Sequence, residues 1–145
     1  MLNPGAALRK VITDNVVVAG LVSTRLYPIA APQSCPKPFG VYFRVDEQRE
    51  RHMRNASGLA RARIQVDWFS TNQDNLFAIM YYARLAADTY RGTVASGGSI
   101  CGVQDISIQN EEEGYEPIAD DSGVPVFRGT QDYFVWYNPQ VAELA

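Results

Sequence analysis

The side chains that could do chemistry in this 145-residue chain are few and widely spaced. Its one histidine, His52, and its two cysteines, Cys35 and Cys101, lie far apart in the sequence. A zinc site needs about four ligands at characteristic spacings, and these three residues supply neither the number nor the spacing. A cysteine nucleophile activated by His52 lacks a supporting local motif for the same reason. We therefore predict no catalytic residue, no metal site and no cofactor.

Phosphate-binding and calcium-binding patterns are also missing. The glycine-containing segment 97–102 matches neither a Walker loop nor the dinucleotide-binding pattern. A run of carboxylates follows, but its spacing is not that of an EF-hand loop. A solvated acidic loop is the more ordinary interpretation of such a run. These observations indicate that the protein is not an enzyme.

Two strongly charged segments remain. One is rich in arginine and is interleaved with acids; its candidate interface residues are Arg49, Arg51, Arg54, Arg61 and Arg63. The other has no basic residue, and its candidate residues are Glu111, Glu112, Glu113, Glu116, Asp120 and Asp121. Both segments could simply be solvated. Alternatively, the basic surface of one copy meets the acidic surface of the next, and such a head-to-tail contact closes into a ring if its rotation allows.

Composition narrows the class of protein further. The net charge is −3 and the isoelectric point is near 5.1, whereas proteins whose main task is to grip nucleic acid are usually strongly basic. Eleven of the 13 basic residues are arginine, which suits protein interfaces better than lysine. No apolar run approaches the roughly 20 residues that span a bilayer. Residues 1–7 do not resemble a secretion signal, so we expect two free thiols rather than a disulfide.

The first half of the chain predicts two short helices and then strands. A helix follows Pro4-Gly5 with one apolar face, and a second covers residues 16–22, capped by Asp14 or Asn15. A short strand is expected at residues 25–27. Strands at residues 39–45 and 60–69 are joined by a charged segment that forms an extended arm or a large loop. In the second of these strands the residues expected in the core are Ala62, Ile64, Val66 and Trp68.

The second half predicts one long helix and more strands. Ser70 and Gln73 fit a capping box at the start of a helix that runs to about Asp88. Its core face is formed by Leu76, Ile79, Met80, Ala83 and Ala87. A strand at residues 100–109, an acidic loop at 110–123 and a last strand at 124–137 complete the chain. The expected fold is therefore a single α+β domain over residues 1–145, with an antiparallel or mixed β-sheet, one long helix packed on it and short N-terminal helices.

The order of these short patterns resembles that of the tail-completion, or tail-terminator, proteins of long-tailed bacteriophages, a group that is similar in fold to head-to-tail joining proteins. The residues that carry the resemblance lie along the whole chain: Ala7-Leu8-Arg9, Val18-Ala19-Gly20-Leu21-Val22, Arg25-Leu26-Tyr27-Pro28, Ala31-Pro32-Gln33, Pro38-Phe39-Gly40-Val41-Tyr42, Gly58-Leu59-Ala60, the strand from Ala62 to Trp68, Tyr90-Arg91-Gly92 and the closing segment from Asp132 to Tyr137. The family has no catalytic motif, so no active-site residue is carried over.

The resemblance implies a structural virion protein assembled in the host cytoplasm. Such a protein forms a homo-oligomeric ring, typically a hexamer, at the head-proximal end of the tail tube. It ends tube growth, contacts the tail-tube protein and joins the tail to the head connector or head-closure protein, while DNA passes through its lumen without specific binding. A head-closure or neck adaptor is an alternative, and a small DNA-binding packaging accessory protein is another. An acidic lining would repel phosphate, so the acidic segment is the candidate inner wall; the rival is that the arginine-rich segment lines it.

Overall fold

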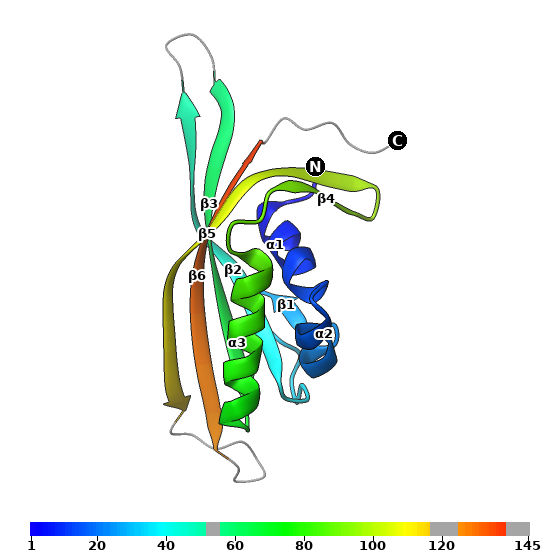
Figure 1. The fold of residues 1–145 in the computed structure, drawn as a ribbon, viewed down its shortest axis with the longest axis vertical. Coiled ribbons are helices and arrows are strands. Elements are labelled where there is room, and N and C mark those ends of the chain that lie inside the picture. Colours follow the sequence, from blue (N-terminus) through cyan, green and yellow to red (C-terminus); the bar gives the residue numbers. More distant parts are fainter. Residues whose placement is uncertain (52–55, 117–124, 139–145) are drawn as a thin grey trace.

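The computed structural model describes residues 1–51, 56–116 and 125–138 and shows an α+β fold (Figure 1). Among these residues there are three helices: α1 (Pro4–Thr13), α2 (Val16–Val22) and α3 (Gln73–Ala87). The strands of the described residues are β1 (Leu26–Pro28), β2 (Phe39–Arg51), β3 (Ala56–Ser70), β4 (Gly92–Ser96), β5 (Ser99–Glu116) and β6 (Val126–Asn138). They form one sheet in the order β1-β2-β3-β6-β5-β4. The β1–β2 pair is parallel and the other pairs are antiparallel, so the sheet is mixed.

The helices begin where short polar side chains can cap them. The Asn3 side chain accepts a hydrogen bond from the backbone N–H of Ala6, and Asn15 accepts from the backbone of Val17 and Val18. The cap predicted for α3 was wrong: Asn72, not Ser70, accepts from the Asn75 N–H. The Ser70 hydroxyl instead bonds the backbone of Asn72 and fixes the turn before the helix. Both Ser70 and Asn72 are residue types that cap helices, and the one nearer to the helix takes the position.

The core lies between the helices and one face of the sheet. The predicted inward residues of β3, from Ala62 to Trp68, are fully buried, and so are Tyr133 and Val135 of β6. The predicted core face of α3 is confirmed in every position. The helix α3 is the longest, but α1 and α2 lie on the same side of the sheet and also fill this core, so the cover is made by all three helices (Figure 1).

Two long hairpins extend the sheet at opposite ends of the molecule (Figure 1). The β2–β3 pair continues past the last β3–β6 pair to Arg51 opposite Ala56, so residues 46–51 and 56–59 of the charged segment form an extended two-stranded arm, and residues 52–55 lie outside the described part. The β5–β6 pair continues to Glu116 opposite Val126 at the other end. The loop expected at residues 110–123 is therefore wrong for 110–116, which are strand. The strand β4 was also not expected; it pairs antiparallel with β5 across a turn at Gly97-Gly98.

Each lateral edge of the sheet is only partly covered within the described residues. The strand β1 pairs with β2 at Gly40–Tyr42, and the outer edge of β2 beyond Tyr42 has no neighbouring strand there. At the other edge, β4 pairs with β5 at Ser99–Val103. The end of α3 covers the next part, because the Thr89 N–H donates to the Ile106 carbonyl and the Ile108 N–H donates to Asp88 Oδ1. Beyond Ile108, the outer edge of β5 again lies beside no strand of the described chain. Exposed strand edges of this kind can pair with other chains.

Candidate assembly surface

The reactive residues noted in the sequence do not converge. Cys101 is buried, and its burial raises the pKa of the thiol to about 11. Cys35 lies near the surface, where its sulfur is 3.7 Å from the Tyr27 hydroxyl. Both are free thiols, as expected. His52 lies outside the described residues. Among the residues that the structure describes, no group of three or more histidine, cysteine or acidic side chains is placed to hold a metal ion.

The most extensive functional candidate is the face of the sheet that the helices leave uncovered, which we call the open face. Residues directly opposite each other in antiparallel strands share a face. The registers therefore place together the residues Arg61, Arg63, Gln65, Asp67 and Phe69 of β3 and Arg128, Thr130, Asp132, Phe134 and Trp136 of β6. Arginine and aromatic residues are the types enriched in protein interfaces.

The charges on the open face are matched by direct contacts. Asp67 is 7% exposed and accepts hydrogen bonds from Arg128 Nη2 (3.0 Å), Thr130 Oγ1 (2.8 Å) and Gln65 Nε2 (3.1 Å). Arg63 Nη2 lies 3.2 Å from Asp132 Oδ2. Charge-assisted bonds between neighbouring strands fix these long side chains in place, which lowers the entropy cost of forming an interface with them.

Aromatic rings interleave with the arginines of the open face. Phe39 and Phe69 are stacked with centroids 5.0 Å apart, and Phe134 meets Trp136 edge to face at 5.7 Å. The Arg61 guanidinium lies 4.3 Å above the Phe134 ring, a distance at which a cation–π attraction operates. The open face therefore offers flat and rigid aromatic area. The arginines beside it are already held by carboxylates or lie over aromatic rings.

A groove of about 510 Å³ runs along the open face beside the part of β5 from Asn110 to Gly114. It is lined by arginines and carboxylates from three strands, including Arg63, Arg128, Asp132 and Glu112. One oxygen in it, Asp132 Oδ1, is buried and accepts no hydrogen bond from the part of the chain that the structure describes. A buried carboxylate oxygen without a donor is costly, and a donor from a neighbouring molecule would satisfy it.

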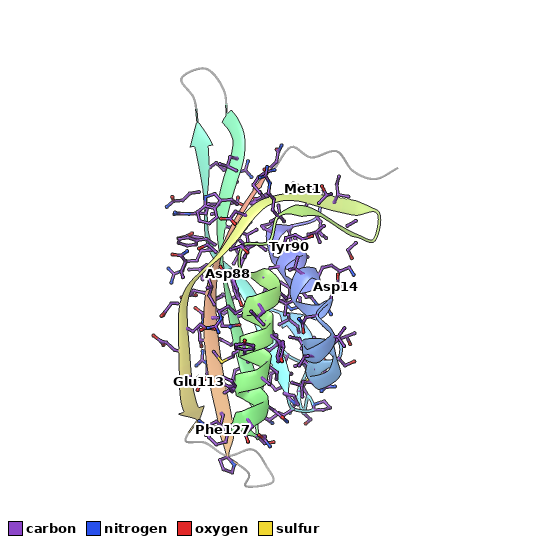
Figure 2. The ribbon with its side chains drawn as sticks, in the orientation of Figure 1. Met1, Asp14, Asp88, Tyr90, Glu113 and Phe127 are labelled. Atoms are coloured by element: carbon purple, nitrogen blue, oxygen red, sulfur yellow. The ribbon has the colours of Figure 1, made fainter. Side chains whose placement is uncertain are left out.

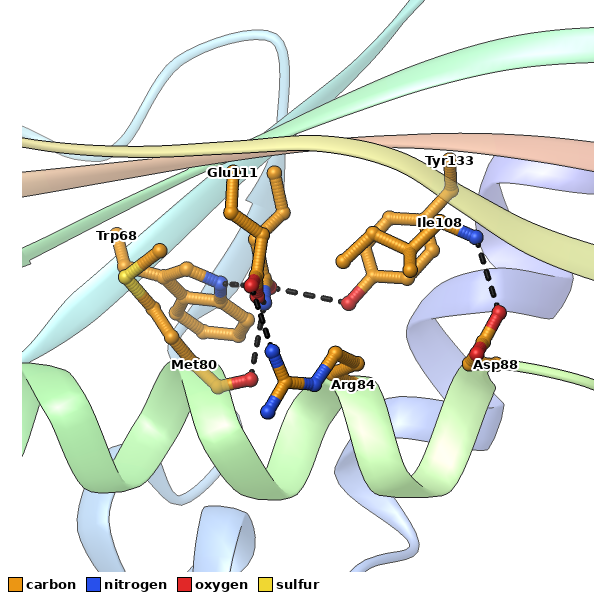
Figure 3. A network of polar contacts seen from close by, with 8 residues as sticks. Trp68, Met80, Arg84, Asp88, Ile108, Glu111 and Tyr133 are labelled. Carbon is orange, nitrogen blue, oxygen red and sulfur yellow. Dashed lines mark hydrogen bonds and ion pairs between the residues drawn. The ribbon is translucent and has the colours of Figure 1, made fainter.

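A buried polar network lies on the other side of the sheet, under α3 (Figure 3). Its centre is Gln131, whose Oε1 accepts from Trp68 Nε1 and from the Tyr133 hydroxyl, each at 3.0 Å. The amide nitrogen of Gln131 donates to the Met80 carbonyl (2.9 Å) and to Glu111 Oε1 (2.6 Å). Arg84 Nη1 of α3 lies 2.7 Å from Glu111 Oε2. The network ties α3 to three strands.

The outward side of α3 carries an apolar stripe that the sequence analysis missed. Phe77, Tyr81 and Leu85 are spaced four residues apart, and Phe77 and Leu85 are 61% and 56% exposed. Phe77 stacks on Tyr81 with centroids 6.1 Å apart. A groove of about 210 Å³ separates this stripe from the edge of β5 and also contacts Glu112 and Glu113. We call this feature the α3–β5 groove. Its signal was present in the sequence as a second apolar row at helical spacing.

The candidate residues from the sequence fall in different places. Arg49 is exposed on the arm, while Arg61 and Arg63 lie on the open face. The backbone of Arg51 ends β2, and Arg54 lies outside the described residues. The acidic set is divided: Glu111 points to the helices, Glu112 lies by register on the open face, and Glu113 lies near the far end of β5 (Figure 2). Glu116 ends β5, and Asp120 and Asp121 lie outside the described residues.

Comparison with solved structures shows a likeness in fold to a virion protein. A chain of the virion of a native gene transfer agent particle matches with a TM-score of 0.63 and 12% sequence identity, over 92% of this chain and 93% of that chain. This likeness concerns the fold. Neither the protein-family models nor the curated protein sequences give a match. Within the described residues, the helices are too short or too polar to cross a membrane.

Proposed function

We propose that this chain is a structural virion protein of a long-tailed phage or phage-like particle, and that it forms a ring at the head-proximal end of the tail tube. In this role it ends growth of the tube and joins the tail to the head connector. It acts by contacts with its own copies and with neighbouring virion proteins, and it turns over no substrate.

The observation that carries the proposal is the likeness in fold to a virion chain over almost the full length of both proteins. A match that spans nine tenths of both chains extends to the arrangement of all the principal elements rather than to one shared motif. It agrees in kind with the tail-completion resemblance found independently in the sequence. Fold alone does not determine function, so the surfaces must support the role as well.

Three surfaces of the molecule support an assembly role. The open face presents aromatic and arginine side chains, the outward side of α3 presents a row of exposed apolar side chains, and both lateral sheet edges are partly uncovered within the described residues. Monomeric proteins seldom expose several apolar surfaces together with uncovered strand edges. These features are those of a subunit that is completed by its neighbours.

We propose further that the part of the open face that neighbouring chains leave uncovered lines the DNA passage. By register, this face holds the carboxylates Asp46, Asp67, Asp105, Glu112 and Asp132 and the arginines Arg61, Arg63 and Arg128, counted over the described side chains. A wall with more carboxylates than arginines, and with its arginines engaged, would hold DNA weakly and allow transit. Of the acidic residues expected at the inner wall, Glu112 fits this arrangement and Glu111 does not.

A DNA-binding accessory role has less support. Such a role needs arginines that are free to neutralise phosphates. On the open face Arg63 and Arg128 form ion pairs with Asp132 and Asp67, and Arg61 donates to Gln48 Oε1 at 2.8 Å while covering Phe134. Phosphate would have to compete with these contacts.

Native mass spectrometry tests the proposal. The chain is purified alone and together with the major tail-tube protein encoded in the same genome, and both samples are examined at near-physiological salt. We expect a closed oligomer of defined subunit number, formed by the chain alone or on the end of the tube. Monomer as the only species in both samples would contradict the proposal. Salt-sensitive DNA binding by that monomer would favour the accessory role instead.

A further inference from the structure

We propose that the ring is closed by one specific contact, in which the outer edge of β2 of one copy enters the α3–β5 groove of the next copy. This inference rests on the proposed ring and names the two surfaces that form it. The occupant of the groove is thus a second copy of this chain.

The two surfaces lie at the opposite lateral edges of the same sheet, since β2 and β5 are separated by β3 and β6. They also lie toward opposite ends of the long axis: the arm containing the end of β2 projects at one end, and the β5 segment with Glu113 lies toward the other (Figures 1 and 2). One molecule therefore cannot join its own two surfaces. Contacts between two different surfaces of identical subunits are head-to-tail and generate rings or filaments.

The charges of the two surfaces are opposite. Arg44 and Arg49 flank Glu47 on β2 at 3.7 and 3.5 Å, and their side chains are 56% and 58% exposed. The Tyr137 hydroxyl also donates to Glu47, which further engages that carboxylate. By register Arg44, Glu47 and Arg49 lie on the helix side of β2, whereas Asp46 lies on the open face. The helix side of the β2 edge thus carries two arginines and one engaged carboxylate, a net positive charge. Across the sheet, Glu112 and Glu113 line the α3–β5 groove and are exposed. Complementary charge of this kind fixes the register of a contact and accelerates association.

Apolar side chains accompany the charges on both surfaces. Ile29, which follows β1 at the β2 edge, is 79% exposed, and Val45 at the β2 bulge is 43% exposed. The groove offers Phe77 and Tyr81 of α3. Burial of such side chains contributes about 25 cal/mol per Å² of apolar area removed from water. Each surface therefore combines an apolar part with a charge that the other surface neutralises.

The backbone also permits the contact. The outer edge of β2 beyond Tyr42 and that of β5 beyond Ile108 lie beside no strand in the described part of the chain. Paired edges would continue the sheet from one copy into the next, and main-chain hydrogen bonds would add to the side-chain contacts. The helix end covers β5 only up to Ile108, through Asp88 and Thr89, and leaves the groove segment accessible.

Cross-linking between engineered cysteines tests the contact. In a Cys35→Ser background, the pair Val45→Cys and Phe77→Cys is treated with a short bis-maleimide under the conditions that give the oligomer. We expect a ladder of covalent multimers on a denaturing gel. The matched control combines Val45→Cys with Val16→Cys, because Val16 on α2 is 84% exposed but lies outside the groove. It should give at least tenfold less product.

Charge reversal gives a second measurement. Arg49→Glu and Glu113→Arg are each expected to reduce the assembled fraction at least tenfold, and the combined variant is expected to recover most of it. Circular dichroism of each variant checks that the monomer is folded. Rings that form while the cysteine pair reacts no better than its control, or a combined variant that does not recover, would overturn this contact and leave the proposed ring standing. If the parent chain gives no oligomer either alone or with the tail-tube protein, both this contact and the proposed ring are overturned.

Discussion

Gln131 connects its own strand β6 to β3, β5 and α3 through side-chain hydrogen bonds. It is fully buried, and it bonds Trp68 of β3, Tyr133 of its own strand, the backbone of α3 and Glu111 of β5. A glutamine amide has one acceptor and two donor hydrogens, which suits a site where two donors and two acceptors meet. Leucine or methionine of similar volume would fill the space but leave the four groups without their partner.

We predict that Gln131→Ala lowers the free energy of unfolding by about 3 kcal/mol, since it leaves buried donors and acceptors unpaired as well as a cavity. Urea denaturation followed by tryptophan fluorescence measures the change. The control is Gln109→Ala, because Gln109 is exposed on β5 and its amide donates to the neighbouring Ser107 Oγ. The control should change stability by no more than about 0.5 kcal/mol. Equal effects from the two substitutions would show that the network contributes little.

The two thiols should differ in reactivity. The pKa of Cys101 is raised from 9.0 to about 11 by burial, so its thiolate is scarce at pH 8 and its reaction rate should rise as pH increases toward that value. We expect one fast equivalent of thiol per folded chain with a disulfide reagent, and two in denaturant. The Cys35→Ser variant should lose the fast equivalent. A fast reaction that persists in this variant would mean that Cys101 is accessible.

Individual site residues were only partly predictable from the sequence. The alternation of β3 marked Arg61 and Arg63 as outward, and the structure places both on the open face. The carboxylates were treated as one acidic loop, either solvated or lining the lumen, yet Glu111 turns inward to Gln131 and Arg84. Nothing local distinguishes Glu111 from Glu112. The difference comes from their strand register against β6, which is a long-range property.

At the scale of elements, helices and strands with strong periodicity were predicted well, and the exceptions have physical causes. The residues of α2 and the core face of α3 were correct because each apolar row has a single interpretation. The segment 110–116 was expected to be a loop because it is acidic. It is strand because its partner β6 supplies the hydrogen bonds and Arg84 and Gln131 supply contacts for Glu111. Pairing with a neighbour outweighs a weak local preference.

The close packing of β1, β2 and β3 depends on a glycine, Gly40 of β2. A Cβ at Gly40 would lie 2.6 Å from the Trp68 ring and 2.8 Å from Leu26. The ring cannot turn away easily because its nitrogen is bonded to Gln131. We predict that Gly40→Ala lowers the melting temperature and reduces the free energy of unfolding by about 1–3 kcal/mol, because the added methyl group overpacks the core.

The matched control for this prediction is Gly20→Ala in α2. A Cβ there would meet no atom within 4 Å, so only helix propensity changes. This substitution should stabilise the protein by about 0.5–1 kcal/mol. Thermal unfolding by circular dichroism measures both variants. A Gly40→Ala protein as stable as the parent would contradict the tight approach of β2 to Trp68.

At the scale of the whole molecule, the arrangement separates the tasks of folding and assembly. One face of the sheet is buried by three helices and holds the core and the Gln131 network. The other face, the outer side of α3 and the two sheet edges remain available to other chains. The sequence indicated charged surfaces suited to self-association, but it could not show that Arg49 of β2 and Glu113 of β5 lie on opposite sides of β3 and β6 in one sheet. That placement follows from the strand order.

In the function that we propose, this chain caps the head-proximal end of a tail tube. The most direct measurement is cryo-electron microscopy of tubes assembled from the tail-tube protein of the same genome, with and without this chain. We expect an additional ring at one end of each tube in the presence of the chain, together with shorter tubes. Tubes with two identical bare ends and an unchanged length distribution would contradict it.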